Sequence, residues 1–155
     1  MRDKDLLLGI DIGTTGTKCS VYDFRGIRVA SAYREYPMIH PRPGWTEQDP
    51  SRWWDTVCCN LQTIFKSQNI DKNRIAAVGT SSTNAVVLVD RQGQPVCNAI
   101  SLHDQRSGHQ VEWLKENIGE ERIRGVAANR IANGSFSLPA LRWLVENQAD
   151  LIKGA

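Results

Sequence analysis

Several features that define specialised protein classes are scarce in this 155-residue sequence. Lys and Arg number 19 against 17 for Asp and Glu, so the net charge is only +2. A charge this small, without a run of basic residues, gives no electrostatic basis for binding nucleic acid or a membrane surface. No apolar stretch approaches the length of a bilayer-spanning helix, and the charged start at residues 1–5 is unlike a signal peptide. We therefore expect a cytoplasmic protein.

Cysteine is also too sparse and too scattered for a metal centre. The four cysteines form no C-x-x-C pair and have no clustered histidines beside them, which argues against zinc. In the cytoplasm we expect all of them to be reduced. Cys58 and Cys59 are adjacent in a helical pattern, so we expect at least one to be buried. The length fits one domain with a sizeable core.

The most informative segment present is residues 9–18, which reads GIDIGTTGTK. It predicts a strand ending in a carboxylate, a turn rich in Gly and Thr, and a second strand. Glycine lets the backbone approach a phosphate closely, and threonine hydroxyls add donors. Asp11 could hold a magnesium ion, which favours oxygen ligands and is usually bound together with phosphates. The alternative is an ordinary β-hairpin whose turn only reverses the chain.

Apolar periodicity indicates the order of the remaining elements. It predicts strands at 6–12, 17–24, 27–36 and 75–80, a hairpin within 86–101, and helices at 50–68, 107–117, 120–126 and 138–148. Short connections make the first three strands an antiparallel meander, and the strand at 75–80, entered from a helix, should lie parallel to the first. The apolar face of the helix at 50–68 is expected to contain Trp54, Val57, Cys58, Leu61 and Ile64.

This order of elements, β-β-β-α-β with a phosphate turn between the first two strands, predicts an α/β fold. It suggests the ribonuclease H-like core of actin-like and sugar-kinase ATPases, a mixed sheet with flanking helices. A Rossmann unit would place its glycine-rich turn between a strand and a helix. A Walker P-loop is excluded because its G-x-x-x-x-G-K-[ST] spacing is absent.

Several segments, in order along the chain, resemble the FGGY carbohydrate kinases. The segment at 11–18 is similar to their first phosphate motif, and the segment at 43–54 (PGWTEQDPSRWW) resembles their tryptophan-rich stretch. Residues 99–106 resemble a sugar-lining segment that ends in D-x-R, and residues 138–152 are similar to a later helix. We expect the tryptophans at 45, 53 and 54 to pack the loop onto the domain rather than to bind sugar.

The resemblance implies ATP and Mg²⁺ as cofactors. Asp11 matches the carboxylate that acts on the nucleotide-bound magnesium, and Gly13, Thr14 and Thr15 match the cradle for the ATP phosphates. Lys18 lies where the family often has a basic residue near the transferred phosphate, although a solvated strand charge is an equal alternative.

The resemblance also implies a set of substrate residues. Thr83 and Asn84 fall where xylulose kinases contact the sugar, and Asp104 and Arg106 fall at the edge of the sugar pocket. His103 could bind a sugar hydroxyl, or it could simply be solvated. For Arg106 a surface salt bridge is the favoured alternative, and Asp104 could instead cap a helix. Xylulose and glycerol kinase motifs are both incomplete here, so the sugar or polyol stays open.

The resemblance covers residues 1–155 as the N-terminal part of the first kinase domain. The general base is expected beyond the chain end, and the second domain, which holds most of the ATP, is expected to be absent. We therefore expect a fragment of a kinase that transfers the γ-phosphoryl of ATP to a sugar or polyol hydroxyl, inactive alone. The alternative is a free-standing, non-catalytic actin-like domain that binds a partner or a sugar. Unpaired edges predict a homo-oligomer.

Overall fold

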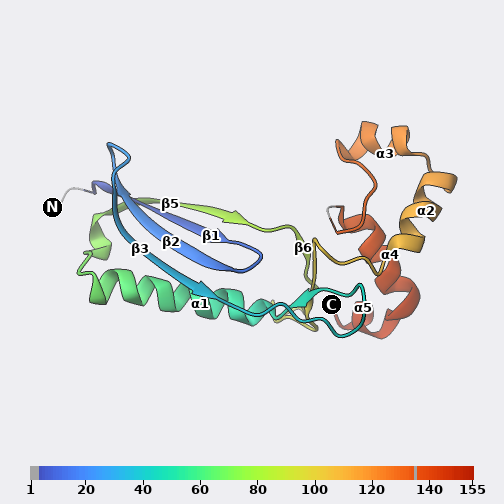
Figure 1. Cartoon of the computed structure of the whole chain (residues 1–155), viewed down its shortest axis with the longest axis horizontal. Helices are drawn as coiled ribbons and strands as arrows, with labels where there is room; N and C mark the ends of the chain where they lie inside the picture. Colours follow the sequence, from blue (N-terminus) through green and yellow to red (C-terminus); the bar gives the residue numbers. More distant parts are fainter. Residues whose placement is uncertain (1–3, 135) are drawn as a thin grey trace. The chain divides into compact units, whose positions relative to one another are not determined.

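The computed structural model describes residues 4–134 and 136–155 (Figure 1). Contacts divide the chain into two compact units, each made of two stretches of sequence. The first unit comprises Met1–Pro37 and Ser51–Thr83, and the second comprises Met38–Pro50 and Asn84–Ala155. The predicted phosphate residues fall in the first unit, and most of the predicted substrate residues fall in the second.

A four-stranded sheet in the order β3-β2-β1-β5 forms the first unit. The strands β1 (Leu6–Ile12), β2 (Gly16–Asp23) and β3 (Arg28–Glu35) make the predicted antiparallel meander. Strand β5 (Ile75–Ser82) pairs with β1 in parallel, which is also as predicted. Because β1 has a hydrogen-bonded neighbour on each side, two independent ladders determine its register.

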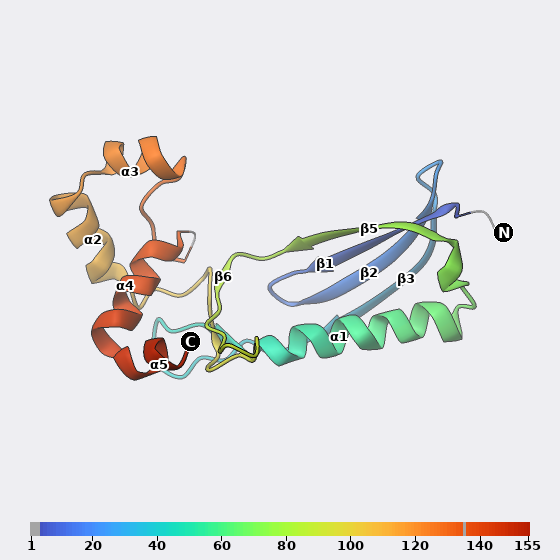
Figure 2. The ribbon, with the colours of Figure 1, turned by 180° about the vertical axis from the view of Figure 1, so that it is seen from behind.

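Helix α1 (Pro50–Gln62) and the π-helical turn that continues it (Thr63–Ser67) cover one face of this sheet, as Figures 1 and 2 both show. Side chains alternate along a strand, so every second residue of β1 and β2 faces the helix. Ile64, with 0% of its surface exposed, lies in the core that results. Its buried partners are Leu6, Leu8, Cys19, Val21 and Ala30.

The buried face of α1 differs from the prediction in its first turns. Val57 is buried as predicted, but Trp54 is 68% exposed, and Thr56 and Asn60 are buried in place of apolar side chains. The cause lies in the sheet, where the residue facing these turns is the fully buried Thr17, a polar residue that needs hydrogen-bonding partners. Helical periodicity alone carries no information about the surface opposite.

The adjacent cysteines also differ from the prediction. Cys58 is half-buried and Cys59 is exposed, so neither of them is a fully buried side chain. All four cysteines are free thiols, and Cys19 is the buried one. Burial raises the pKa of the Cys19 thiol, because an apolar environment disfavours the thiolate.

The second unit contains a small sheet and four helices. Strands β4 (Glu47–Gln48), β7 (Ala99–Ser101) and β6 (Ala85–Val86) pair in that order. The predicted hairpin within 86–101 is much reduced, with a single bridge between Val89 and Pro95 beyond β6 and β7. Helices α2 (Gly108–Asn117), α3 (Glu120–Ala127) and α4 (Ser137–Asn147) match the predicted ranges closely. A short α5 (Ala149–Gly154) follows that was not predicted as a separate helix.

Apolar side chains from these helices form two clusters in the second unit. One contains Val111, Leu114, Ile123 and Ile131, and the other contains Ile100, Ala140 and Leu144. The N-cap residue of α4 is Phe136, which has extended backbone geometry and no capping side chain. The first turn of α4 is therefore held by packing of Ala140 rather than by a side-chain cap.

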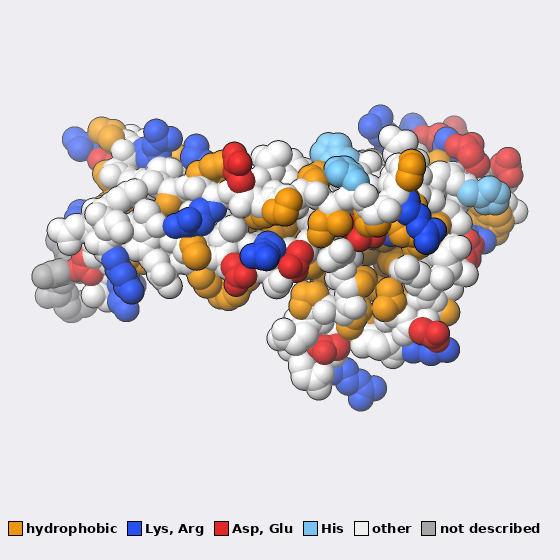
Figure 3. Space-filling view, turned by 60° about the horizontal axis from the view of Figure 1, so that its bottom comes forward, with side chains coloured by type: hydrophobic (Ala, Val, Ile, Leu, Met, Phe, Trp, Pro, Cys, Tyr) orange, Lys and Arg blue, Asp and Glu red, His pale blue; other side chains and the backbone are white. Residues whose placement is uncertain are grey.

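The surface agrees with the low net charge. Basic and acidic side chains lie next to one another over much of the face drawn in Figure 3. Within the described ranges, the structure has no helix that is both long enough and apolar enough to cross a membrane.

Candidate functional site

The turn between β1 and β2 is a tight hairpin with Thr14 and Thr15 at its tip. The Gly13 N–H donates to the Gly16 carbonyl oxygen at 3.0 Å and closes it. Neither glycine has a positive φ, so backbone freedom does not explain them. Space does: a Cβ on Gly16 would lie 2.5 Å from the Arg34 carbonyl oxygen, and one on Gly13 would lie 3.2 Å from the Gly16 carbonyl oxygen. Glycine allows the strands to approach this closely.

Two tyrosines at the end of β3 hold this turn. The Tyr36 hydroxyl donates to the Gly13 carbonyl oxygen, and its backbone N–H lies 3.3 Å from the Thr15 carbonyl oxygen. The Tyr33 hydroxyl is 3.3 Å from Thr15 Oγ1. Burial raises the pKa of Tyr36, so its hydroxyl remains a donor at neutral pH. Neither tyrosine could be selected from the sequence, because both lie beyond the motif, which ends at residue 18.

Asp11 and Lys18 lie opposite each other on neighbouring strands beside the turn. The register pairs Asp11 of β1 with Lys18 of β2, and both side chains are exposed on the sheet face away from α1. They line a groove of about 430 Å³. Gly9 and Gly79 also line it, and they have no side chains to fill it. The structure thus brings the predicted carboxylate, the lysine and the turn together at one end of the first unit.

The donor set beside the turn fits a magnesium ion that is bound together with phosphates. Mg²⁺ in such sites takes one or two carboxylates, and phosphate oxygens and water complete its shell. Asp11 offers an exposed carboxylate of this kind. Among the described residues no group of three or more His, Cys, Asp or Glu could hold a metal by itself. An ion at Asp11 would therefore need oxygen ligands from the phosphates.

Thr83 joins the same end of the first unit. Its backbone N–H donates to the Ile12 carbonyl oxygen at 2.7 Å, so the end of β5 lies next to the start of the turn. The Thr83 Oγ1 atom is buried and has no hydrogen-bond partner among the described atoms. Such an orphaned hydroxyl is unusual, and a substrate hydroxyl would satisfy it. Asn84, the next residue, is exposed and is the first residue of the second unit's longer segment.

Asp104 and Arg106 are buried inside the second unit, with side chains only 1% and 2% exposed. Arg106 donates from Nε to Asp104 Oδ1 at 2.9 Å and from Nη2 to Asp104 Oδ2 at 2.8 Å. Its Nη2 also donates to Glu47 Oε1 at 2.7 Å. The planar guanidinium fork matches the carboxylate geometry. The ion pair is real, but the expectation of a surface location is wrong.

Asp104 also does not cap a helix. The N-cap of α2 is Ser107, whereas Asp104 accepts hydrogen bonds from the backbone N–H groups of Arg106 at 2.9 Å and of Thr46 at 2.6 Å. Both its oxygens are fully engaged. Asp104 therefore ties the loop after β7 to the 44–47 segment, whereas the neighbouring His103 is exposed.

Two tryptophans enclose the Arg106 guanidinium. Its central carbon lies 3.8 Å from the ring centre of Trp45 and 5.2 Å from that of Trp143. The two rings meet edge to face, with centres 5.2 Å apart at 85°. Trp45 thus packs its segment onto the unit, as predicted, while Trp54 is exposed. Sequence reasoning missed Trp143, which lies far along the chain in an ordinary helical pattern.

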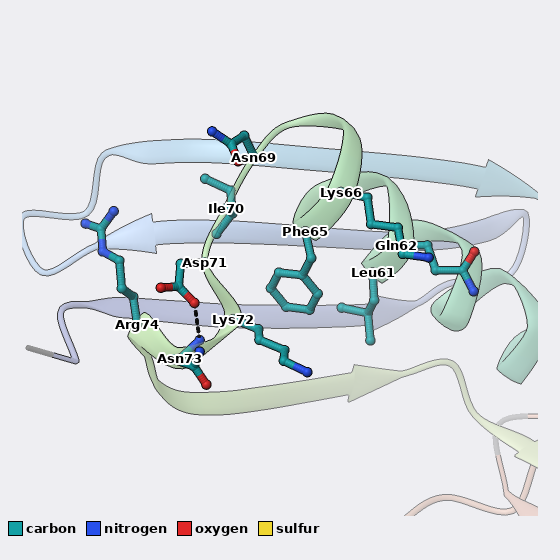
Figure 4. A pocket seen from close by; sticks show the side chains of 10 residues that line it. All are labelled: Leu61, Gln62, Phe65, Lys66, Asn69, Ile70, Asp71, Lys72, Asn73 and Arg74. Carbon is teal, nitrogen blue, oxygen red and sulfur yellow. Dashed lines mark hydrogen bonds between the residues drawn. The ribbon is translucent and has the colours of Figure 1, made fainter. Parts of the chain in front are cut away.

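Another pocket of the first unit lies at its other end. It measures about 930 Å³ and lies between the end of α1 and the loop before β5 (Figure 4). Phe65, Leu61 and Ile70 line it together with two lysines, and the Asp71 carboxylate is bound to the Asn73 N–H at 3.0 Å. The pocket is at the amino end of β1, about 20 Å from Asp11 along the strand, so it takes no part in the candidate site.

Comparison with known proteins identifies the family of this chain. The model of the N-terminal domain of the FGGY family of carbohydrate kinases matches residues 6–155. A glycerol kinase of Paraburkholderia phytofirmans is 33% identical over 143 residues, covering 91% of this chain and 28% of that protein. One of Haloferax volcanii is 34% identical over 146 residues, with 93% and 28% covered.

Solved structures agree with the sequence relatives. A xylulose kinase of Rhodospirillum rubrum superposes with a TM-score of 0.88 at 26% identity, covering 96% of this chain and 30% of that one. A gluconate kinase of Lactobacillus acidophilus gives 0.86 at 26%, with 97% and 30% covered. The predicted fold class, ribonuclease H-like and incomplete, is confirmed. The chain spans less than a third of the length of each of these relatives. The roles of the individual site residues stay predictions.

The buried ion pair generates a stability prediction. Arg106→Lys keeps the charge but loses the fork and the ring contacts, so we expect the free energy of unfolding to fall by about 2 kcal/mol or more. Arg124→Lys is the matched control, because Arg124 is 63% exposed and pairs with Glu120 on the same helix. It should change stability by less than about 0.5 kcal/mol. Urea unfolding and the near-ultraviolet circular dichroism of the tryptophans measure both. Equal stability of the two variants would contradict the structural role.

Proposed function

This chain belongs to the FGGY family of carbohydrate kinases, and we propose that it carries the first half of an ATP site at the β1–β2 turn. In the intact enzyme the reaction would be transfer of the γ-phosphoryl of ATP to a sugar or polyol hydroxyl. The bond between the γ-phosphorus and its bridging oxygen breaks, a new phosphorus–oxygen bond forms, and the hydroxyl proton passes to a general base. The observation that supports this best is the exposed Asp11 carboxylate beside the glycine-rich turn.

Each residue of the turn has a role in this proposal. Asp11 would hold Mg²⁺, and the ion would neutralise negative charge on the phosphates. Gly13, Thr14 and Thr15 place backbone and hydroxyl donors against the phosphates. The Lys18 ammonium, opposite Asp11 in the register, balances negative charge as the phosphoryl group moves.

The substrate side rests on fewer contacts. We propose that the Thr83 hydroxyl, buried and without a partner in the described part of the chain, bonds a substrate hydroxyl, with the exposed Asn84 and His103 as further candidates. Within the second unit, Asp104 and Arg106 fix the loop that carries His103. The chemical class is a sugar or a polyol, since the named relatives include glycerol, xylulose and gluconate kinases.

We further propose that these 155 residues form the N-terminal part of the first kinase domain and do not turn over alone. The chain spans about 28% of the length of the curated glycerol kinases that it matches, and phosphoryl transfer needs both substrates and a base to be positioned together.

A cytoplasmic location suits ATP and the free thiols. The proposed inactivity can be tested directly. When the 155-residue chain is given ATP with glycerol or D-xylulose, we expect it to release ADP no faster than background. Measurable turnover by this chain would contradict the proposal.

The proposed magnesium role predicts that substituting Asp11 affects tripolyphosphate binding in opposite ways with and without Mg²⁺. With Mg²⁺, Asp11→Asn should weaken tripolyphosphate binding by about tenfold, because the ion loses its protein ligand. Without Mg²⁺, the same change removes a negative charge near the phosphates, so binding should be unchanged or tighter. Calorimetric titration in magnesium and in EDTA measures both values.

Asp55→Asn supplies the control for this experiment. Asp55 is an exposed residue of α1, and its substitution removes the same charge. It should leave the ratio of the two affinities unchanged. If Asp11→Asn behaves as Asp55→Asn does, the carboxylate does not hold the metal.

We also propose that the chain associates through β5. This edge strand pairs only with β1 among the described strands, and its sequence IAAVGTSS has neither charge nor proline. The opposite edge, β3, carries Arg28, Arg34 and Glu35. Natural edges that avoid pairing are usually protected by such charges. A second copy could therefore add its own β5 to this edge.

Association through β5 predicts a dimer that one charge disrupts. Val78 is 56% exposed on β5, so Val78→Lys should shift the molar mass by light scattering from dimer to monomer. Val126→Lys, at an 87% exposed position on α3, should leave the dimer intact. A wild-type chain that is monomeric at high concentration, or a dimer insensitive to Val78→Lys, would exclude this interface.

A further inference from the structure

The face of α1 next to the phosphate turn is buried and yet polar. Thr56 is 9% exposed and Asn60 is 0% exposed, although both project from a helix that otherwise covers an apolar core. Burying polar groups is costly unless they are hydrogen-bonded. The partners of these two side chains therefore indicate why they are there.

Both side chains bind Thr17, the first residue after Gly16. Thr56 Oγ1 lies 2.9 Å from Thr17 Oγ1, and also 2.9 Å from the carbonyl oxygens of Arg52 and Trp53 in its own helix. Asn60 Nδ2 donates to the Thr17 carbonyl oxygen at 2.8 Å. Thr17 is itself fully buried. Helix α1 thus fixes both the side chain and the backbone of the residue on which the turn ends.

Tyr36 fixes the other side of the same turn. Its hydroxyl binds the Gly13 carbonyl oxygen, its N–H binds the Thr15 carbonyl oxygen, and the residue is only 7% exposed. In a trans peptide the C=O and the following N–H point in opposite directions. Holding the Gly13 carbonyl therefore aims the Thr14 N–H away from Tyr36, and holding the Thr15 carbonyl does the same for the Gly16 N–H.

We propose that Tyr36, Thr56 and Asn60 are positioning residues for bound phosphate: Tyr36 sets the direction of the turn's N–H groups, and Thr56 and Asn60 hold Thr17, the residue on which the turn ends. This rests on the proposed phosphate site. An apolar side chain of the same shape would fill the same space, but only a hydroxyl or an amide can determine the orientation of a peptide plane. Donors that are held in place before the ligand arrives bind it without reorganisation.

The test separates the hydroxyl of Thr56 from its methyl group. Thr56→Val keeps the shape and removes the hydroxyl, whereas Thr56→Ser keeps the hydroxyl and removes the methyl. We expect Thr56→Val to weaken Mg²⁺-tripolyphosphate binding by about tenfold, equivalent to about 1.4 kcal/mol, and Thr56→Ser to retain wild-type affinity. Amide chemical shifts of residues 14–17 in nitrogen-15 spectra of the 155-residue chain report both affinity and free-state geometry.

Two further variants complete the design. Tyr36→Phe removes one hydroxyl from the other side of the turn and should weaken binding in the same way as Thr56→Val. Thr63→Val is the matched control: Thr63 Oγ1 donates to the Cys59 carbonyl oxygen at 3.0 Å within the helical segment and does not touch the turn. This control should leave both the affinity and the shifts of residues 14–17 unchanged.

The outcomes distinguish this inference from the function on which it rests. The positioning role is supported if the wild type and Thr56→Ser, which have the hydroxyl, bind tripolyphosphate more tightly than Thr56→Val. If Thr56→Val binds as tightly as the wild type, or if the affinities of the variants follow their thermal stability or side-chain volume, the positioning role is overturned. The phosphate site itself would then remain in place. If tripolyphosphate causes no shift at residues 14–17 of the wild-type chain, the phosphate site is itself wrong and the inference fails with it.

Discussion

The candidate site depends on the register of β1 between two ladders. Strand β1 is antiparallel to β2 and parallel to β5, and this arrangement brings Asp11, the turn and Thr83 to one end of the sheet. Side chains alternate between faces, so a slip by one residue would turn Asp11 into the core and Leu8 out of it. The apolar contacts of Leu8 beneath α1 therefore hold the carboxylate in solvent. The packing of β1 against α1 thus determines on which face of the sheet the Asp11 carboxylate lies.

The second unit is organised around a buried charge instead of a ladder. Arg106 collects the carboxylates of Asp104 and Glu47 and the rings of Trp45 and Trp143. These groups come from the 45–47 segment, the loop after β7 and helix α4, so one guanidinium joins three parts of the unit. Desolvating such a group is costly, and its removal leaves unpaired buried carboxylates. The short strands of this unit contribute little regular pairing, which makes the ion cluster more important.

The elements that could be predicted from the sequence are those long enough to show a regular pattern of apolar residues. The meander, α1 and the parallel β5 follow from periodicity, and the turn follows from its glycines and Asp11. Strands β4 and β6, with two residues each, are too short to show a period of two. The burial of Arg106 was missed because a charged residue in a polar loop normally lies at the surface. Asn60 and Tyr36 were missed because hydrogen bonds to a distant backbone leave no local pattern.

The parallel pairing of β1 with β5 has a consequence for how the chain folds. The meander joins neighbours in sequence, whereas the ladder to β5 closes a long loop, as the separation of 69 residues between Asp5 and Arg74 shows. Closing a long loop costs more chain entropy than closing a short one. The hairpin that carries the phosphate turn is therefore favoured to form early, and Thr83 arrives only when β5 docks. The proposed phosphate turn and the proposed substrate side are thus completed in separate steps of folding.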